Sequence, residues 1–160
     1  MPTNYWITTH WPVPEVETAF GRHVYVKERH VTVPKSDDVV FVRESVRVKG
    51  KLSPTVDRCH LGLRRPTVIP RGYGGIIGRM TVGGGHRPIA AHDVVYEYDD
   101  LHAWSIIECH GFERLQLPLP ELMAAIGQPG TTSTRFLHLW HVPDKHVPTL
   151  LRAVEAVTGR

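Results

Sequence analysis

Cysteine is scarce in this chain of 160 residues, which contains only Cys59 and Cys109. Two cysteines cannot build a disulfide framework, and this excludes the class of small disulfide-stabilised secreted domains. Long apolar runs are also missing, because no stretch approaches the roughly 20 residues that span a bilayer. The first residues lack a basic segment followed by an apolar run. We therefore expect no signal peptide, no membrane partner and a cytoplasmic protein.

The sequence also lacks the short motifs that most often carry catalysis or cofactor binding. No C-x2-C or H-E-x-x-H pattern marks a zinc site, although the chain has 11 histidines. No P-loop or G-x-S-x-G elbow occurs. The segment Arg71–Gly78 (RGYGGIIG) begins like a dinucleotide loop but has Ile77 at the last required glycine. We therefore expect no metal, no cofactor and no catalytic residue.

Basic residues are concentrated in the middle of the chain. Between Arg43 and Arg87 stand ten basic and two acidic residues, a net charge of 10 − 2 = +8, whereas the whole chain carries +3. Much of this charge lies in Ser45–Pro70, which prolines interrupt and which we expect to be a long loop inserted in a single domain. This composition favours binding to the phosphate backbone of a nucleic acid, because Arg and Lys displace condensed counterions. A solvated arginine-rich loop explains the same composition, and both interpretations remain open.

Short segments rich in β-branched and aromatic residues predict a mostly β protein. Turn residues bound them, among them Lys35–Asp38 and the glycines of Gly83–Gly85. Their number and irregular spacing predict a small barrel or a half-open sheet. The predicted strands are Asn4–Thr9, His23–Lys27, Val39–Arg43, Gly75–Val82, Trp104–Cys109 and Arg135–Trp140.

Helices are fewer than strands. Pro120–Ile126 begins with proline and is followed by Gly127, a typical C-cap. A terminal helix is predicted between Asp144 as N-cap and Gly159 as stop. A weaker helical turn is expected in Pro14–Phe20. The terminal helix has an apolar stripe at helical spacing that we expect in the core, made of Val147, Leu150, Leu151, Val154 and Val157.

Aromatic residues gather near the beginning of the chain. Tyr5, Trp6 and Trp11 fall within seven residues, and His10 stands beside Trp11. On a strand Tyr5 and Trp6 point to opposite faces, so one of them need not lie in the core. Trp11 follows the strand, where an indole either closes the end of a barrel or lines a pocket. Stacking contributes about 1–3 kcal/mol per base, so two aromatic walls can hold a flipped nucleobase. The alternative is that every tryptophan packs in the core.

Several blocks occur along the chain in an order that resembles one known family. Asn4–Pro12 (NYWITTHWP) resembles the first strand and proline-terminated turn of EVE domains, which belong to the PUA-like superfamily and are related to YTH domains. The resemblance covers nearly the whole chain outside the Ser45–Pro70 insertion. The further blocks are Asp38–Ser45 (DVVFVRES), Gly74–Val82 (GGIIGRMTV), Trp104–Ile126 (WSIIECHGFERLQLPLPELMAAI) and Arg135–Leu151.

The resemblance implies an α+β fold, a PUA-like mixed β pseudo-barrel of about five or six strands with short helices and an amphipathic C-terminal helix. It implies a non-catalytic nucleic-acid reader that takes a modified base by base flipping, such as methylated or hydroxymethylated cytosine in DNA. We expect modified DNA in preference to RNA as the partner, although the YTH branch reads methyladenine in RNA. A separate nuclease fits such a reader as partner, because no nuclease motif is encoded here. Carried onto this sequence, the pocket turn corresponds to Thr9, His10 and Trp11, and a cage wall to Tyr25. From residue types we add Trp6, Ser45 and Trp104 to the expected pocket, and from the basic charge we expect phosphate contacts at Arg64, Arg65 and Arg79.

Two departures from the family pattern leave the identity of the base open. His23-Val24-Tyr25 stands where a YTH cage has Gly-Val-Trp, and His10-Trp11 replaces a small and polar or acidic pair. Two other functions remain alternatives. One is an RNA-binding accessory module without preference for a modified base. The other is a small hydrolase or nuclease resembling ASCH domains, for which a polar set could come from Thr9, Lys27, Glu28, Arg43 and Glu44.

Overall fold

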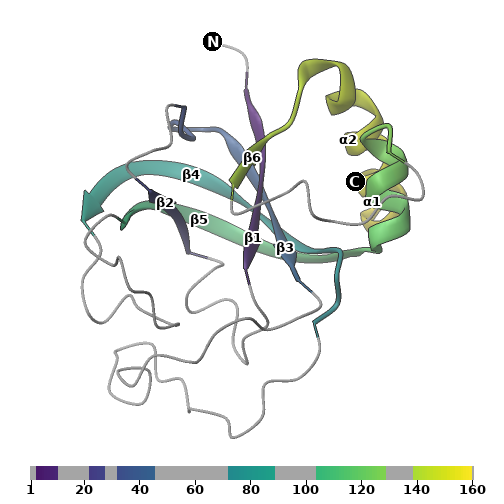
Figure 1. Cartoon of the computed structure of the whole chain (residues 1–160), viewed down its shortest axis with the longest axis horizontal. Coiled ribbons are helices and arrows are strands. Elements are labelled where there is room, and N and C mark those ends of the chain that lie inside the picture. Colours follow the sequence, from purple (N-terminus) through teal and green to yellow (C-terminus); the bar gives the residue numbers. More distant parts are fainter. Residues whose placement is uncertain are drawn as a thin grey trace, which may run out of the picture.

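A computed structural model describes six stretches of the chain, which form a curled six-stranded sheet and two short helices (Figure 1). The described residues are 3–10, 22–27, 32–45, 72–88, 104–128 and 139–159. The strands are β1 (Tyr5–His10), β2 (His23–Lys27), β3 (Val39–Glu44), β4 (Ile76–Pro88), β5 (Trp104–Leu117) and β6 (Leu139–His141). The helices are α1 (Leu119–Ala125) and α2 (Val147–Thr158), which follows a 3-10 turn at Asp144–His146.

The sheet is mixed, and its strand order positions the candidate site. The order is β2-β5-β4-β3-β1-β6, in which β1 and β3 run parallel and every other neighbouring pair runs antiparallel. Because β1 and β3 are parallel, their carboxyl ends meet at the same edge of the sheet. His10 is in register with Glu44 at that edge, and Thr9 is in register with Arg43.

The sheet curls into half a barrel, and glycines inside β4 allow it to do so. The sequence predicted a turn at Gly83–Gly85, but β4 continues through these residues to Pro88, so that prediction is wrong. The pairing of β4 with β5 shifts between Val82 and His86, as expected for a bulge. Gly84 has φ +101 and lies against Ser36, a conformation that other residues rarely adopt. Glycine here coils the strand and does not end it.

β5 is also longer than the sequence predicted. The expected strand ended at Cys109 before a polar turn, whereas β5 continues to Leu117. Gly111, with φ 69, accommodates an irregularity in the middle of the strand. Beyond it Leu115 and Leu117 are buried and alternate with exposed neighbours, which is the pattern of a half-buried strand.

The helices lie at one end of the sheet, beside the end of β5, and α2 packs against β5 (Figure 1). In α2 the apolar stripe packs inward, with Leu150 and Val154 fully buried. Val157 was expected in the core but is 44% exposed, because it lies at the margin of the stripe in the last turn. The hydrophobic core here comprises Ile7, Phe41, Ile76, Leu115, Leu117, Leu122, Met123, Ala125, Ile126, Val142, Leu150 and Val154.

Backbone hydrogen bonds close the C-terminal ends of both helices. Gly127 takes the left-handed conformation after α1, and Gln128 N–H donates to the Met123 carbonyl at 2.7 Å, which is a Schellman motif. Gly159 closes α2 in the same left-handed conformation, as the sequence predicted. Asp144 was predicted to cap α2. It begins the 3-10 turn, and His146 occupies the N-cap position without a capping side chain.

Some predicted elements fall outside the described residues. These are the helical turn Pro14–Phe20, the first part of the predicted strand Arg135–Trp140, and nearly all of Ser45–Pro70. Within the described part of the chain, no helix has the length and apolar character needed to cross a membrane.

Candidate nucleic-acid site at the ends of β1 and β3

The parallel strands β1 and β3 end beside the segment that enters β4. Ser45 N–H donates to the His10 carbonyl at 2.9 Å, which ties the two strand ends together. Gly74 N–H donates to the Glu44 carbonyl at 2.9 Å, and Glu44 N–H donates to the Gly75 carbonyl at 3.2 Å. We call this set the strand-end site, and define it as Thr9, His10, Arg43, Glu44, Ser45 and Tyr73–Gly75.

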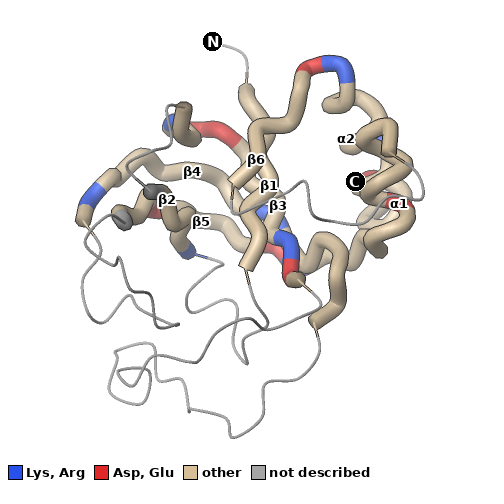
Figure 2. Tube along the Cα trace, in the orientation of Figure 1, with Lys and Arg blue, Asp and Glu red and all other residues tan. Residues whose placement is uncertain are grey.

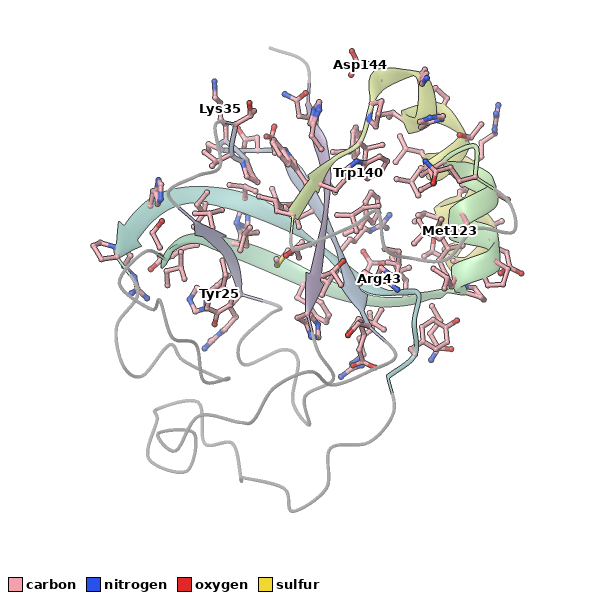
Figure 3. The ribbon with its side chains drawn as sticks, in the orientation of Figure 1. Tyr25, Lys35, Arg43, Met123, Trp140 and Asp144 are labelled. Atoms are coloured by element: carbon pink, nitrogen blue, oxygen red, sulfur yellow. The ribbon has the colours of Figure 1, made fainter. Side chains whose placement is uncertain are left out.

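Arg43 places a buried positive charge at this site. Its side chain is 2% exposed, and its Nε donates to the Gly74 carbonyl at 2.8 Å. Desolvation by burial lowers the pKa of Arg43 from 12.5 to about 10, so the guanidinium remains protonated at neutral pH. In Figure 3 the Arg43 side chain lies on the side of the sheet toward the helices. Arg43 therefore anchors the segment before β4 and contributes positive potential to the strand ends.

Thr9, His10 and Ser45 were expected to supply polar groups for a base edge, and the structure brings all three to the strand-end site. Thr9 Oγ1 is buried and has no hydrogen-bond partner in the part of the chain that is described. His10 is 5% exposed and Ser45 is half-buried. Register places Thr9 on one face of the sheet and His10 on the other, so the two residues share the end of β1 but their side chains point to opposite faces.

Sequence reasoning did not nominate Tyr73 as part of a site, and it named Glu44 only in the polar set of the alternative catalytic function. Tyr73 N–H donates to Glu44 Oε1 at 2.8 Å, and the Tyr73 side chain is 40% exposed. The sequence signal was present as a single aromatic residue between two glycines, Gly72 and Gly74, but it was weighed only as a dinucleotide loop. The strand ends thus carry an exposed aromatic ring that no sequence motif indicated.

Trp6 was expected to line the base pocket, but the structure places it in the interior. It is 3% exposed, and its Nε1 donates to Asp38 Oδ2 at 3.0 Å. Its ring lies against His141, with 4.7 Å between the ring centroids. The indole therefore joins β1 to the start of β3 and to β6, and this placement does not support a role as an open pocket wall.

The other expected aromatic walls are not gathered with Thr9 and His10. Tyr25 is 5% exposed and lies on β2, which three strands separate from β1 in the sheet order. Figure 3 shows Tyr25 on the β2 side of the sheet, far across the view from Arg43. Trp104 is the first residue of β5, but its side chain lies outside the described part of the structure. Trp11 lies outside the described residues.

Arg79 was expected to bind phosphate, but in the structure it forms an ion pair within the sheet. Its Nη2 lies 3.2 Å from Glu113 Oε2, in an ion pair between β4 and β5. Figure 2 shows basic and acidic residues interspersed along the described chain. The other expected phosphate ligands, Arg64 and Arg65, lie outside the described residues.

The polar set considered for catalysis is split by the register of the strands. Thr9 and Arg43 share one face, and Glu44 lies on the other. Among the described residues, no group of three or more His, Cys, Asp or Glu side chains could hold a metal ion. Burial raises the pKa of the Cys109 thiol to about 12, so the reactive thiolate is suppressed at neutral pH.

Comparison of the chain with protein-family models, with curated proteins and with solved structures gives no match.

Proposed function

We propose that this chain is a non-catalytic nucleic-acid reader of the PUA-like kind, related to EVE domains, which accepts a modified base at the strand-end site. The observation that carries the proposal is the gathering of Thr9, His10 and Ser45 at one end of a curled mixed sheet. The order of sequence blocks that resembles EVE domains supports it independently. Modified DNA as partner, a separate nuclease acting with the reader and a cytoplasmic location belong to the same proposal.

The chemistry of these three residues suits the edge of a base. A hydroxyl group donates and accepts hydrogen bonds, and an imidazole can do either according to its tautomer. A buried hydroxyl without a partner, such as that of Thr9, is a cost to the free protein that a ligand could remove. The charge of Arg43 beneath the strand ends favours the carbonyl oxygens of a base over apolar ligands.

Two further parts of the interface are assigned from the sequence. Trp11 follows His10 directly in the sequence and is our candidate for the aromatic wall. Arg64 and Arg65 of Ser45–Pro70, which we call the basic segment, are our candidates for phosphate contacts, which position the strand without reading it. We leave Arg79 out of the interface because Glu113 already neutralises it.

Titration of labelled oligonucleotides tests the proposal. Single-stranded and duplex DNA and RNA would carry cytosine, methylcytosine, hydroxymethylcytosine, adenine or methyladenine at one position, and binding would be measured at two salt concentrations. We expect tighter binding at low salt and a preference of about 1–3 kcal/mol for one modified base. Equal affinity for all bases in RNA would favour the accessory RNA-binding function. Cleavage of any substrate would overturn the non-catalytic assignment, and absence of binding at low salt would reject the proposal.

Trp11→Ala tests the aromatic wall within the same assay. If Trp11 stacks on the base, the variant loses about 1–3 kcal/mol of binding free energy while its melting temperature changes little. If Trp11 packs in the core, unfolding becomes easier by about 3–5 kcal/mol and the folded fraction binds normally. The second result would remove Trp11 from the site.

A further inference from the structure

Tyr73 combines an exposed ring with a fixed backbone. Within the described part of the chain, the exposed large hydrophobic side chains are those of Tyr73, at 40%, and Val157, at 44%. Tyr73 N–H donates a hydrogen bond to Glu44 Oε1, and the N–H of the next residue, Gly74, donates to the Glu44 carbonyl. The buried Nε of Arg43 donates a hydrogen bond to the Gly74 carbonyl. The aromatic ring is thus presented to solvent from an anchored stretch of chain.

Such a ring is suited to stacking on an unpaired base. Tyrosine has few rotatable bonds, so it offers a flat apolar surface at a small cost in conformational entropy. Anchoring of the backbone reduces that cost further, because the residue is already in place before a ligand arrives. By contrast, the exposed Val157 lies in the last turn of α2, outside the strand-end site, and presents no flat ring.

The charges beside Tyr73 restrict what can stack there. Glu44 accepts a hydrogen bond from the Tyr73 backbone. A Cβ at Gly75 would lie 3.0 Å from Pro118 C and Leu119 N, so the segment Tyr73–Gly75 packs against the start of α1, whose first turn carries Glu121. Partial desolvation, together with the negative charge of Glu121, raises the pKa of Tyr73 above its usual value of 10. Carboxylates repel phosphate groups but accept hydrogen bonds from the exocyclic amino groups of cytosine and adenine. Thymine and uracil present a carbonyl oxygen at that place instead.

We propose that Tyr73 stacks on an unpaired base, and that Glu121 favours the amino group at cytosine N4 or adenine N6 over the carbonyl oxygen that thymine presents there. The inference rests on the proposed function, because it assigns a stacking residue and a base class to the strand-end site. It does not depend on Trp11 or on the basic segment.

The test uses labelled single-stranded oligo-dC, oligo-dA and oligo-dT of equal length with the full chain. We expect the wild type and Tyr73→Phe to bind oligo-dC and oligo-dA more tightly than oligo-dT. Tyr73→Ala should bind oligo-dC and oligo-dA about 5- to 150-fold more weakly, as expected for the loss of one stacked base. Val157→Ala is the matched control, since it truncates an equally exposed side chain elsewhere, and should bind as the wild type does.

The outcomes separate this inference from the proposed function. Binding by the wild type that Tyr73→Ala leaves intact would overturn the role of Tyr73 and leave the reader function standing. An equal loss in Tyr73→Phe and Tyr73→Ala would assign the effect to the hydroxyl group and overturn stacking. Glu121→Gln should reduce the preference for oligo-dC and oligo-dA over oligo-dT, and an unchanged preference would overturn the part assigned to Glu121. Failure of the wild type to bind any oligonucleotide would overturn both proposals, and melting curves confirm that each variant is folded.

Discussion

At the scale of single residues, Asp38 organises the start of the sheet. It is 5% exposed, and its carboxylate accepts hydrogen bonds from Asn4 N, Trp6 Nε1 and Lys35 N at 3.1, 3.0 and 2.9 Å. Asp38→Asn replaces one acceptor oxygen by a donor amide that faces N–H groups. We expect unfolding to become easier by about 2–4 kcal/mol, since each hydrogen bond to a charged group contributes about 1.5–3 kcal/mol. Urea denaturation measures this.

Asp37→Asn is the matched control for Asp38. Asp37 is exposed and has φ 72, a conformation that asparagine tolerates as well as aspartate does, so its replacement should change stability by less than about 0.5 kcal/mol. Equal losses in the two variants would mean that the carboxylate of Asp38 does not organise this corner of the sheet.

Thr9 is the residue at which stability and function should respond with opposite signs. Its hydroxyl is buried and has no partner among the described residues. Thr9→Val keeps the shape of the side chain and removes the unsatisfied oxygen, so the free protein should gain about 1 kcal/mol of stability. If the hydroxyl reads a base, the same variant should bind the preferred oligonucleotide about 0.5–1.5 kcal/mol more weakly. A gain in stability with unchanged affinity would make Thr9 a packing residue only.

At the scale of elements, Gly78 shows how β4 accommodates a neighbouring ring. A Cβ at this position would lie 2.4 Å from two ring atoms of Phe112 on β5. Gly78→Ala should therefore destabilise the fold by about 1–3 kcal/mol, and the loss should shrink in a Phe112→Ala background because the obstructing ring is gone. Gly85→Ala in the same strand is the control, since its Cβ would meet only ordinary contacts at 3.5 Å and beyond. Similar losses at the two glycines would attribute the effect to the strand backbone instead of the ring.

The strands and their contacts differ in how much of them the local sequence predicts. β2 was predicted at its observed bounds, because a short alternating run needs no distant partner to be recognised. β4 was predicted too short, since Gly83–Gly85 indicates a turn locally and only the pairing with β5 keeps the strand extended. The hydrogen bond from Ser45 N–H to the His10 carbonyl depends on the parallel pairing of β1 with β3, which no local sequence pattern predicts. The burial of Trp6 was not predicted either, because its partner Asp38 lies 32 residues away in the sequence.

At the scale of the whole molecule, the distribution of charge distinguishes a nucleic-acid interface from a solvated loop. Charges of the described residues are mixed in sign, so an excess of positive charge must come largely from the basic segment of the sequence (Figure 2). Replacing Arg64 and Arg65 together by Ala should weaken binding of every duplex roughly uniformly, because phosphate contacts carry no sequence information. The slope of log affinity against log salt should fall by roughly 0.9 for each phosphate that the variant no longer neutralises.

A second pair of cations separates local binding of phosphate from net charge. Lys145 and Arg152 are exposed, one in the 3-10 turn before α2 and one in α2, and replacing both by Ala removes the same charge from the chain. Exposed charges more than about 8–10 Å from a phosphate are screened at physiological salt, so this control should leave the slope nearly unchanged. A fall in slope only in the Arg64 and Arg65 variant would place these arginines against phosphates. An equal fall in both variants would reduce the effect to net charge, and an unchanged slope in both would make the basic segment a solvated loop.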